Sequence, residues 1–244
     1  MKNIILALVF TGFILISASQ AQNQFESDTI KTLSGDVIIT CIGHGTLMFT
    51  YHQLVIHVDP VSQYADYSKL PDGDIILVTH HHGDHLDKTA LDQIMKPATD
   101  LLVTETCAKE FKKGLVMKNG DSRMVQGIKV EAVPAYNIIH KRESGLPFHP
   151  RGVGNGYVLT LGEIKIYIAG DTENIPEMKK LTGIDIVFLP MNLPYTMTPE
   201  MVADAITMFH PKILYPYHYG NTDPRELMVL LQNKDVKIRI RKMN

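Results

Sequence analysis

The chain has 244 residues and a formal net charge of −2 at pH 7, with 45% of its residues hydrophobic and 20% charged. The charge is nearly balanced and the sequence has no basic patch or tail, which argues against nucleic acid as a partner. Two cysteines, Cys41 and Cys107, are too few for a disulfide framework and lack metal-ligand spacing. We expect buried thiols, although an oxidising compartment would permit them to pair.

The N-terminus has the pattern of a targeting signal. The short basic start, Met1-Lys2-Asn3, is followed by an uncharged apolar run over residues 4–16 and by Ser19-Gln20-Ala21, a small-x-small cleavage pattern. A membrane helix is the alternative, but the run is short for a bilayer span and no basic flank follows it. We therefore predict a signal peptide at residues 1–21, a periplasmic or secreted protein without a stable membrane anchor, and one domain at residues 22–244.

After a polar stretch at residues 22–32, expected to be loose, short β-branched runs indicate closely spaced strands. Helical spacing covers residues 88–95, and the patterns Thr198-Pro199-Glu200 and Asp223-Pro224 predict N-caps of two further helices. Strands dominate the first half and alternate with helices later, which indicates an α/β (α+β) fold of layered sheets and helices. The expected strands are residues 37–41, 47–51, 54–58, 75–78, 101–104, 128–133, 156–161, 164–169, 186–189 and 213–215.

The strongest chemical signal is the run Thr79-His80-His81-His82-Gly83-Asp84-His85, directly after the buried strand at residues 75–78. Alternate side chains of extended backbone share a side, so His80 and His82 converge while His81 points away. Gly83 permits a turn, after which Asp84 and His85 face a second, neighbouring point. Imidazole and carboxylate groups suit zinc, and also iron or manganese. A polar turn that is merely rich in histidine is the weaker alternative.

Further candidate groups follow other strands. Asp171 and His218 each come after an apolar run, at the carboxyl ends of strands where ligand sites form in α/β folds. An Asp that starts a turn and a half-buried His are their ordinary alternatives. Asp59 either orients a ligand imidazole or caps a loop. His44 lies between two glycines, which indicates close backbone approach and gives a pocket role and a turn role equal weight.

The His-x-His-x-Asp-His pattern of this run resembles the signature of the metallo-β-lactamase superfamily. Blocks around Asp59, Asp171 and His218 follow in that family's order, and the chain is similar to the branch of ascorbate-6-phosphate lactonase-like proteins. The resemblance implies a four-layer αβ/βα sandwich of two mixed sheets flanked by helices. It also implies two divalent metal ions, with Zn²⁺ expected first and Mn²⁺ or Fe²⁺ as alternatives.

One position departs from the family's pattern. Asn137 stands where many members have a metal-binding His, and an amide oxygen is a poorer zinc ligand than imidazole. The block around His149 resembles one of this branch, so we take His149 as the replacement ligand and interpret His140, in a charged run, as a solvated loop residue. The predicted metal ligands are His80, His82, Asp84, His85, His149, Asp171 and His218, with Asp171 bridging the two ions as in the family.

Two close cations imply a hydrolase in which a bridging hydroxide attacks a lactone, an ester or a phosphodiester of a small molecule. Asp84 is the predicted catalytic residue, since it would hold one metal, orient the nucleophile and pass a proton to the leaving group. An exported metal-binding protein without turnover is the alternative. The residues expected to line the pocket or to support the ligands are His44, Asp59, Tyr136, Asn137, Tyr195 and Tyr217.

Overall fold

Two seven-stranded sheets, one from each half of the chain, form the centre of the molecule. The computed structural model describes residues 24–243, so the predicted signal peptide lies outside the described residues. The first sheet contains β1 (Glu26–Ile30), β2 (Val37–Gly43), β3 (Thr46–Tyr51), β4 (Leu54–Val58), β5 (Gly73–Leu77), β6 (Met95–Val103) and β7 (Leu115–Val116). The second contains β8 (Ser122–Val125), β9 (Ile128–Ala135), β10 (Gly154–Leu161), β11 (Ile164–Ile168), β12 (Ile186–Pro190), β13 (Ile213–Tyr217) and β14 (Lys237–Ile238).

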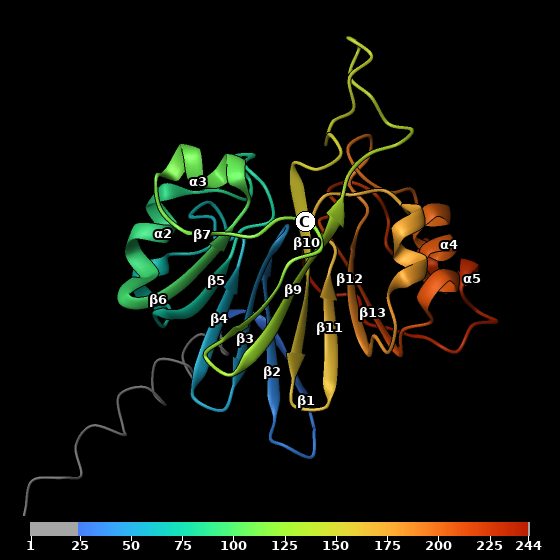
Figure 1. The fold of residues 1–244 in the computed structure, drawn as a ribbon. Coiled ribbons are helices and arrows are strands. Elements are labelled where there is room, and N and C mark those ends of the chain that lie inside the picture. Colours follow the sequence, from blue (N-terminus) through green and yellow to red (C-terminus); the bar gives the residue numbers. More distant parts are fainter. Residues whose placement is uncertain (1–23, 244) are drawn as a thin grey trace, which may run out of the picture.

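Both sheets have the same pairing pattern. In the first, β1 to β4 pair antiparallel and β4 to β7 pair parallel. In the second, β8 to β11 pair antiparallel and β11 to β14 pair parallel. Figure 1 shows the two sheets packed face to face, with the carboxyl ends of their parallel strands at the same edge of the molecule.

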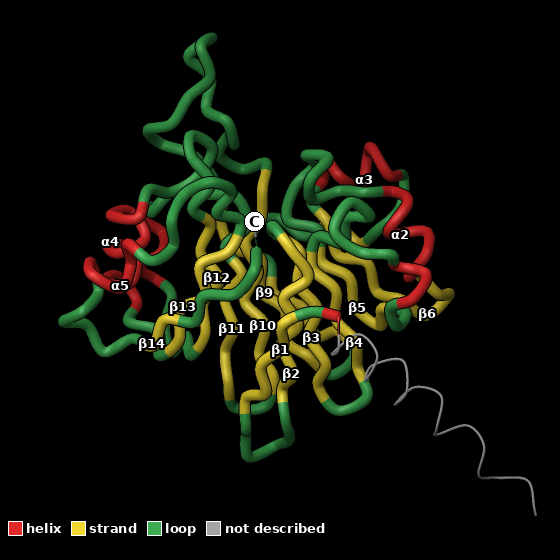
Figure 2. Tube along the Cα trace, turned by 180° about the vertical axis from the view of Figure 1, so that it is seen from behind, coloured by secondary structure: helices red, strands yellow, loops and turns green. Residues whose placement is uncertain are grey.

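Helices cover the outer face of each sheet. Helices α2 (Lys88–Ile94) and α3 (Glu105–Phe111) lie on the first sheet, and α4 (Pro199–Phe209) and α5 (Glu226–Leu230) lie on the second (Figures 1 and 2). Two short 3-10 turns, Tyr67–Lys69 and Pro176–Lys180, lie in connecting loops. The order helix, sheet, sheet, helix confirms the predicted four-layer sandwich. No helix within residues 24–243 combines the length and the apolar character needed to cross a bilayer.

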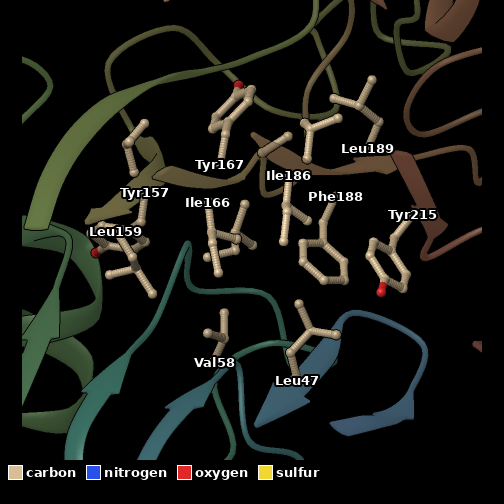
Figure 3. Close-up of a cluster of buried hydrophobic side chains, with 14 of the residues drawn as sticks. Leu47, Val58, Tyr157, Leu159, Ile166, Tyr167, Ile186, Phe188, Leu189 and Tyr215 are labelled. Carbon is tan, nitrogen blue, oxygen red and sulfur yellow. The ribbon is translucent and has the colours of Figure 1, made fainter. Parts of the chain in front are cut away.

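The core between the sheets is apolar and aromatic. Phe188 of β12 stacks on Tyr215 of β13 with ring centroids 4.8 Å apart, and it meets Phe49 of β3 edge-on at 5.9 Å. Figure 3 shows Leu47 and Val58 of the first sheet facing side chains of the second. Complete burial of such a side chain is worth roughly 1.5–3 kcal/mol. This layer therefore fixes one sheet against the other and holds their loop edges together.

The strand β5 is buried on both faces, as its continuous apolar run predicts. Ile75 and Leu77 belong to the core between the sheets, whereas Ile76 and Val78 pack with Leu91 and other side chains of α2 and α3. Both cysteines are free and buried, in agreement with the expectation of buried thiols. Burial raises the pKa of Cys41 to about 12 and that of Cys107 to about 11.

The prediction of a loose segment at residues 22–32 is wrong for residues 26–30, because β1 pairs with β2 at the edge of the first sheet. The exposed side of an edge strand tolerates polar side chains, so the apolar alternation that signals an inner strand is missing. Asp28 adds specific contacts: its carboxylate accepts hydrogen bonds from the Tyr215 hydroxyl at 2.8 Å and from Nη2 of Arg241 at 2.7 Å.

One of the two predicted helix starts is correct. The Thr198 hydroxyl accepts a hydrogen bond from the backbone N–H of Met201, as the cap of α4. The prediction that Asp223 caps the last helix is wrong, since α5 begins at Glu226 without a side-chain cap. The Asp223 carboxylate instead accepts hydrogen bonds from the backbone N–H and the guanidinium of Arg225, which competes with the capping geometry.

Candidate metal centre

All predicted ligands meet at the loop edge of the two sheets. The predicted ligands follow strand ends or lie in adjoining loops: His80 to His85 after β5, His149 between β9 and β10, Asp171 after β11 and His218 after β13. Two residues predicted to support them, His44 after β2 and Asp59 after β4, lie at the same edge. The loops pack closely. A Cβ atom added to Gly45 would lie 2.8 Å from Cε1 of His85 and 3.2 Å from Cδ2 of His218, so this turn requires glycine.

The first group of donors consists of His80, His82 and His149, whose ligand atoms lie within 4.8 Å of one another. His80 Nε2 is 3.1 Å from His82 Nδ1, and the rings of His82 and His149 are 4.9 Å apart. His80 and His149 are buried, whereas His82 is partly exposed. The alternation predicted for the run therefore brings His80 and His82 together, and the long loop between β9 and β10 supplies the third imidazole.

The second group lies beside the first and is built around Asp84. The ligand atoms of Asp84, His44 and His218 form one cluster, and those of His80, His85 and Asp171 form another that adjoins it. Oδ2 of Asp84 is 3.5 Å from His218 Nε2 and 3.2 Å from His44 Nε2. Burial alone would raise the pKa of Asp84, but the adjacent imidazoles of His218 and His44 hold that pKa below its usual range.

Asp171 lies between the two groups. Its Oδ2 is 3.1 Å from His149 Nε2 and 3.8 Å from His80 Nε2. Its other oxygen, Oδ1, is 3.5 Å from both His85 Nε2 and His218 Nε2. Each carboxylate oxygen thus faces a different set of imidazoles, and the side chain is 4% exposed.

The unsatisfied atoms at this centre are those that a metal ion would use. Within residues 24–243, His85 Nε2, Asp171 Oδ1 and His218 Nε2 are buried without a hydrogen-bond partner and lie within 3.5 Å of one another in two pairs that share Asp171 Oδ1. Buried polar atoms are normally paired, so a group of them that faces one point indicates a ligand. Several imidazoles with two carboxylates match the donors that zinc, iron and manganese accept. The residues present therefore fit divalent metal ions.

Asp59 fixes the protonated nitrogen of two ligands. Its Oδ2 is 2.8 Å from His85 Nδ1, which must donate to it, and it also accepts the Thr79 hydroxyl at 2.7 Å. Because that hydroxyl donates to Asp59, its oxygen accepts from His80 Nδ1, which lies 3.0 Å away. Both histidines then present Nε2 toward the centre. Of the two roles weighed for Asp59, the structure favours the orientation of ligand imidazoles.

Asn137 fixes His149 in the same way. The two amide hydrogens of Asn137 are donated to Glu173 and to the backbone carbonyl of Tyr195, so the orientation of the amide is defined. Its oxygen accepts from the backbone N–H of His149 at 2.9 Å and from His149 Nδ1 at 2.7 Å. His149 Nε2 is therefore the free nitrogen, and it is the atom that faces Asp171. Asn137 was expected to line the pocket or to support a ligand, and it has the second of these roles, because its side chain is buried and binds His149.

The protonation of the ligands follows from burial and neighbouring charge. Burial, reinforced by His149, lowers the pKa of His82 to about 4. Burial and the nearby His85 hold the pKa of His80 well below its usual range. Both imidazoles are thus neutral at pH 7, the form that binds metals. For His85, burial disfavours the charge, but Asp171 and Asp59 outweigh it and raise its pKa to about 9.

A cavity of about 490 Å³ opens above the centre. His44 and Tyr195 line it, as expected from the sequence. Tyr217 has the other role expected for it: it is fully buried, and its hydroxyl accepts the backbone N–H of Gly170 and supports the turn before Asp171. The expectation is wrong for Tyr136, which does not line the cavity and whose hydroxyl donates to Glu177. The lining residues that sequence reasoning missed are Tyr64, Arg142, Phe148 and Asn192.

Glu173 is a further residue that sequence reasoning missed. It is fully buried, and its carboxylate accepts the backbone N–H groups of Ile138, Ile139 and His140 at 2.6–2.8 Å. The expectation that His140 is solvated is wrong, since its Nδ1 lies 2.9 Å from Glu173 and its side chain is only 20% exposed. The position of Glu173, two residues after Asp171, was the available signal for a role at the centre.

Two packed sheets that carry a cluster of imidazoles and carboxylates at one loop edge are the arrangement found in metallohydrolases. A family model described as the beta-lactamase superfamily domain matches residues 38–218, and the chain belongs to that superfamily. The family resemblance recognised in the sequence is thereby confirmed.

Known relatives place the chain more narrowly. A UPF0173 metal-dependent hydrolase from Methanopyrus kandleri is 30% identical over 201 residues, which cover 77% of this chain and 86% of the relative. A crystal structure from Parabacteroides distasonis, assigned as a metal-dependent hydrolase, is 51% identical with a TM-score of 0.87, over 90% of this chain and 100% of its own.

A more distant structure shows that the fold alone does not determine the reaction. CmlA, a diiron beta-hydroxylase from Streptomyces venezuelae, matches with a TM-score of 0.69 at 18% identity, over 88% of this chain and 54% of its own. At that identity the likeness shows the fold alone. Proteins that share a fold can differ in reaction, so the chemistry of this chain depends on its site.

Proposed function

We propose that this chain is a hydrolase that depends on two divalent metal ions, with zinc best suited to the donors. The observation that carries the proposal is the buried carboxylate of Asp171. One of its oxygens lies 3.1 Å from His149 Nε2, and the other lies 3.5 Å from His85 Nε2 and His218 Nε2. A carboxylate that faces two sets of imidazoles is suited to bridge two cations, which lie about 3.5–4 Å apart in binuclear sites.

Bound cations would supply a water activated at neutral pH and would polarise the attacked oxygen of the substrate. In this proposal one ion is held by His80, His82 and His149, the other by Asp84, His85 and His218, and Asp171 contributes to both. Asp84 is the carboxylate that substrate can reach, since 42% of its side chain is exposed against 4% for Asp171. We therefore assign to Asp84 a proton relay: it would take up the proton released by the attacking water and pass it to the leaving group.

The proposed substrate is a small molecule with a lactone, ester or phosphodiester bond. The cavity of about 490 Å³ lies within the range of small-molecule sites, about 300–1,000 Å³. Curated relatives that are named metal-dependent hydrolases support the hydrolase class. The substrate class is supported by the size of the cavity and by the metal-binding residues that line it. The names of the relatives do not specify a substrate.

The test is a turnover screen of the zinc-saturated protein with lactone, carboxylic ester, phosphodiester and β-lactam substrates. We expect hydrolysis of at least one class, and a loss of about 100-fold or more in His82→Ala, since loss of a ligand's outer partner alone costs about 10–100-fold. His52→Ala is the matched control, because His52 is an exposed turn residue at the end of β3. A wild-type protein that binds two metals yet hydrolyses none of these substrates would favour the alternative, a metal-binding protein without turnover.

A further inference from the structure

Arg142 is the cationic residue at the mouth of the cavity. Among the described residues that line this cavity, it is the only lysine or arginine. We infer that the substrate carries a carboxylate or phosphate group away from the bond that is hydrolysed, and that Arg142 binds this group. The inference rests on the proposed function and specifies the substrate class of the same site.

The loop between β9 and β10 holds Arg142 in place. This loop rises above the body of the molecule (Figure 1) and closes on itself through a β-bridge between Lys141 and Pro147. The backbone N–H of Arg142 donates to the carbonyl of Leu146 at 2.8 Å, and the carbonyl of Arg142 accepts from Gly145 at 2.8 Å. The main chain at Arg142 is therefore held in an ordered turn beside the cavity.

The guanidinium of Arg142 has unused donors. Its carbon lies 5.2 Å from the ring centroid of Phe148, and Nη2 makes one long hydrogen bond of 3.4 Å to the Phe148 carbonyl. None of the salt bridges within residues 24–243 involves Arg142, whereas Arg151 in the same loop pairs with Glu177. An arginine has five N–H donors in a planar fork that matches carboxylate and phosphate oxygens. The side chain is exposed, so an anionic ligand in the cavity can bind these donors in place of water.

Aromatic side chains lie between this cation and the metal-binding residues. The rings of Phe148 and Tyr195 meet edge to face at 5.0 Å, and the ring of Tyr64 stacks on His44 at 5.3 Å. All four line the same cavity. A substrate that reacts at the floor of the cavity and extends toward Arg142 would pass these rings. The lining thus suits a short molecule with an apolar or cyclic body and an anionic end.

The test measures ligand binding by calorimetry and does not require turnover. The ligands are butyrate, with one carboxylate, and glutarate and 4-phosphonobutyrate, each with a second anionic group. They are titrated into zinc-loaded wild type, Arg142→Gln and Arg151→Gln, and bound zinc is measured for each protein. Arg151→Gln is the matched control, because it removes a charge from the same loop but not from the cavity lining.

We expect wild type to bind at least one of the doubly anionic ligands about 10- to 100-fold more tightly than butyrate, the range of charge-assisted hydrogen bonds. Arg142→Gln should erase this preference while zinc content stays unchanged, and Arg151→Gln should keep it. The ligand with the larger loss identifies the anionic group as carboxylate or phosphate. A preference that is absent from wild type, survives in Arg142→Gln or disappears equally in Arg151→Gln would overturn the inference. Because calorimetry measures binding, the preference for doubly anionic ligands can be tested even if the turnover screen detects no hydrolysis.

Discussion

His149 was assigned from the sequence only by resemblance, and the reason for its position is now visible in its contacts. Asn137 accepts a hydrogen bond from His149 Nδ1 at 2.7 Å, which leaves Nε2 3.1 Å from Asp171. The residue that departs from the family's ligand pattern therefore orients the residue that replaces it. Hydrogen-bond direction of this kind cannot be predicted from spacing, because 12 positions separate the two residues along the chain.

Replacement of His149 separates the two candidate ligands of this loop. We expect His149→Ala to lower bound zinc from two equivalents toward one, because the first group of donors loses its third imidazole. His140→Ala should keep both equivalents, since His140 contacts Glu173 and belongs to none of the donor groups in the described residues. Metal analysis after dialysis provides the measurement. Full zinc content in His149→Ala would show that the assignment is wrong.

The pH dependence of zinc binding follows from His85. Its pKa is raised from 6.5 to about 9, so at neutral pH the metal-free protein carries a second proton on this imidazole, at Nε2. Zinc must displace that proton, and each pH unit below the pKa then costs up to about tenfold in affinity. We expect zinc affinity to rise with pH from 6.5 to about 9 and then level off. Competition titrations with a chelator would measure it, and equal affinity across this range would contradict the assignment.

At the scale of elements, continuous apolar runs and capping patterns were sufficient to place most of the frame. The run at β5 and the cap at Thr198 predicted elements within a residue or two of the observed bounds. Helix α3 was missed although Thr104 caps it and Glu105 follows, the same signal in a less apolar setting. The edge strand β1 could not be predicted from alternation, because contacts of Asp28 with distant residues hold it.

The loop between β9 and β10 is anchored by a single buried carboxylate. The backbone N–H groups of His140, Ile139 and Ile138 and the Asn137 amide hold the pKa of Glu173 below its usual range, against the effect of burial. Glu173 thus binds four consecutive residues, 137–140, at the start of the loop that contains His149. The loop that supplies a ligand therefore depends on Glu173 for its conformation.

Glu173→Gln tests this dependence. An amide cannot accept all of these hydrogen bonds, so we expect a loss of about 2 kcal/mol or more in stability, since bonds to charged groups contribute about 1.5–3 kcal/mol each. We also expect zinc affinity to fall about 10–100-fold through misplacement of Asn137 and His149. Glu177→Gln is the matched control and should change stability by about 1 kcal/mol or less, because its ion-pair partner Arg151 is 71% exposed and the glutamine oxygen can still accept a hydrogen bond. Denaturant unfolding and zinc titration measure both effects, and unchanged zinc affinity in Glu173→Gln would refute the anchoring role.

At the scale of the whole molecule, the centre depends on both halves of the chain. The run after β5 supplies four donors from the first sheet, whereas His149, Asp171 and His218 come from the second. The order of motif blocks predicted this set of strand ends. It could not predict which face of each loop the side chains use, so the sequence did not distinguish Tyr195, which lines the cavity, from Tyr136 and Tyr217, which do not.

The central claim is that the centre holds two metal ions bridged by Asp171. The most direct measurement is the number of zinc equivalents bound per chain at saturation, by elemental analysis of the purified protein, with Asp171→Asn beside wild type. We predict two equivalents for wild type and fewer for Asp171→Asn, because an amide offers only one oxygen to the two ions. A wild-type protein that saturates with a single equivalent would contradict the account.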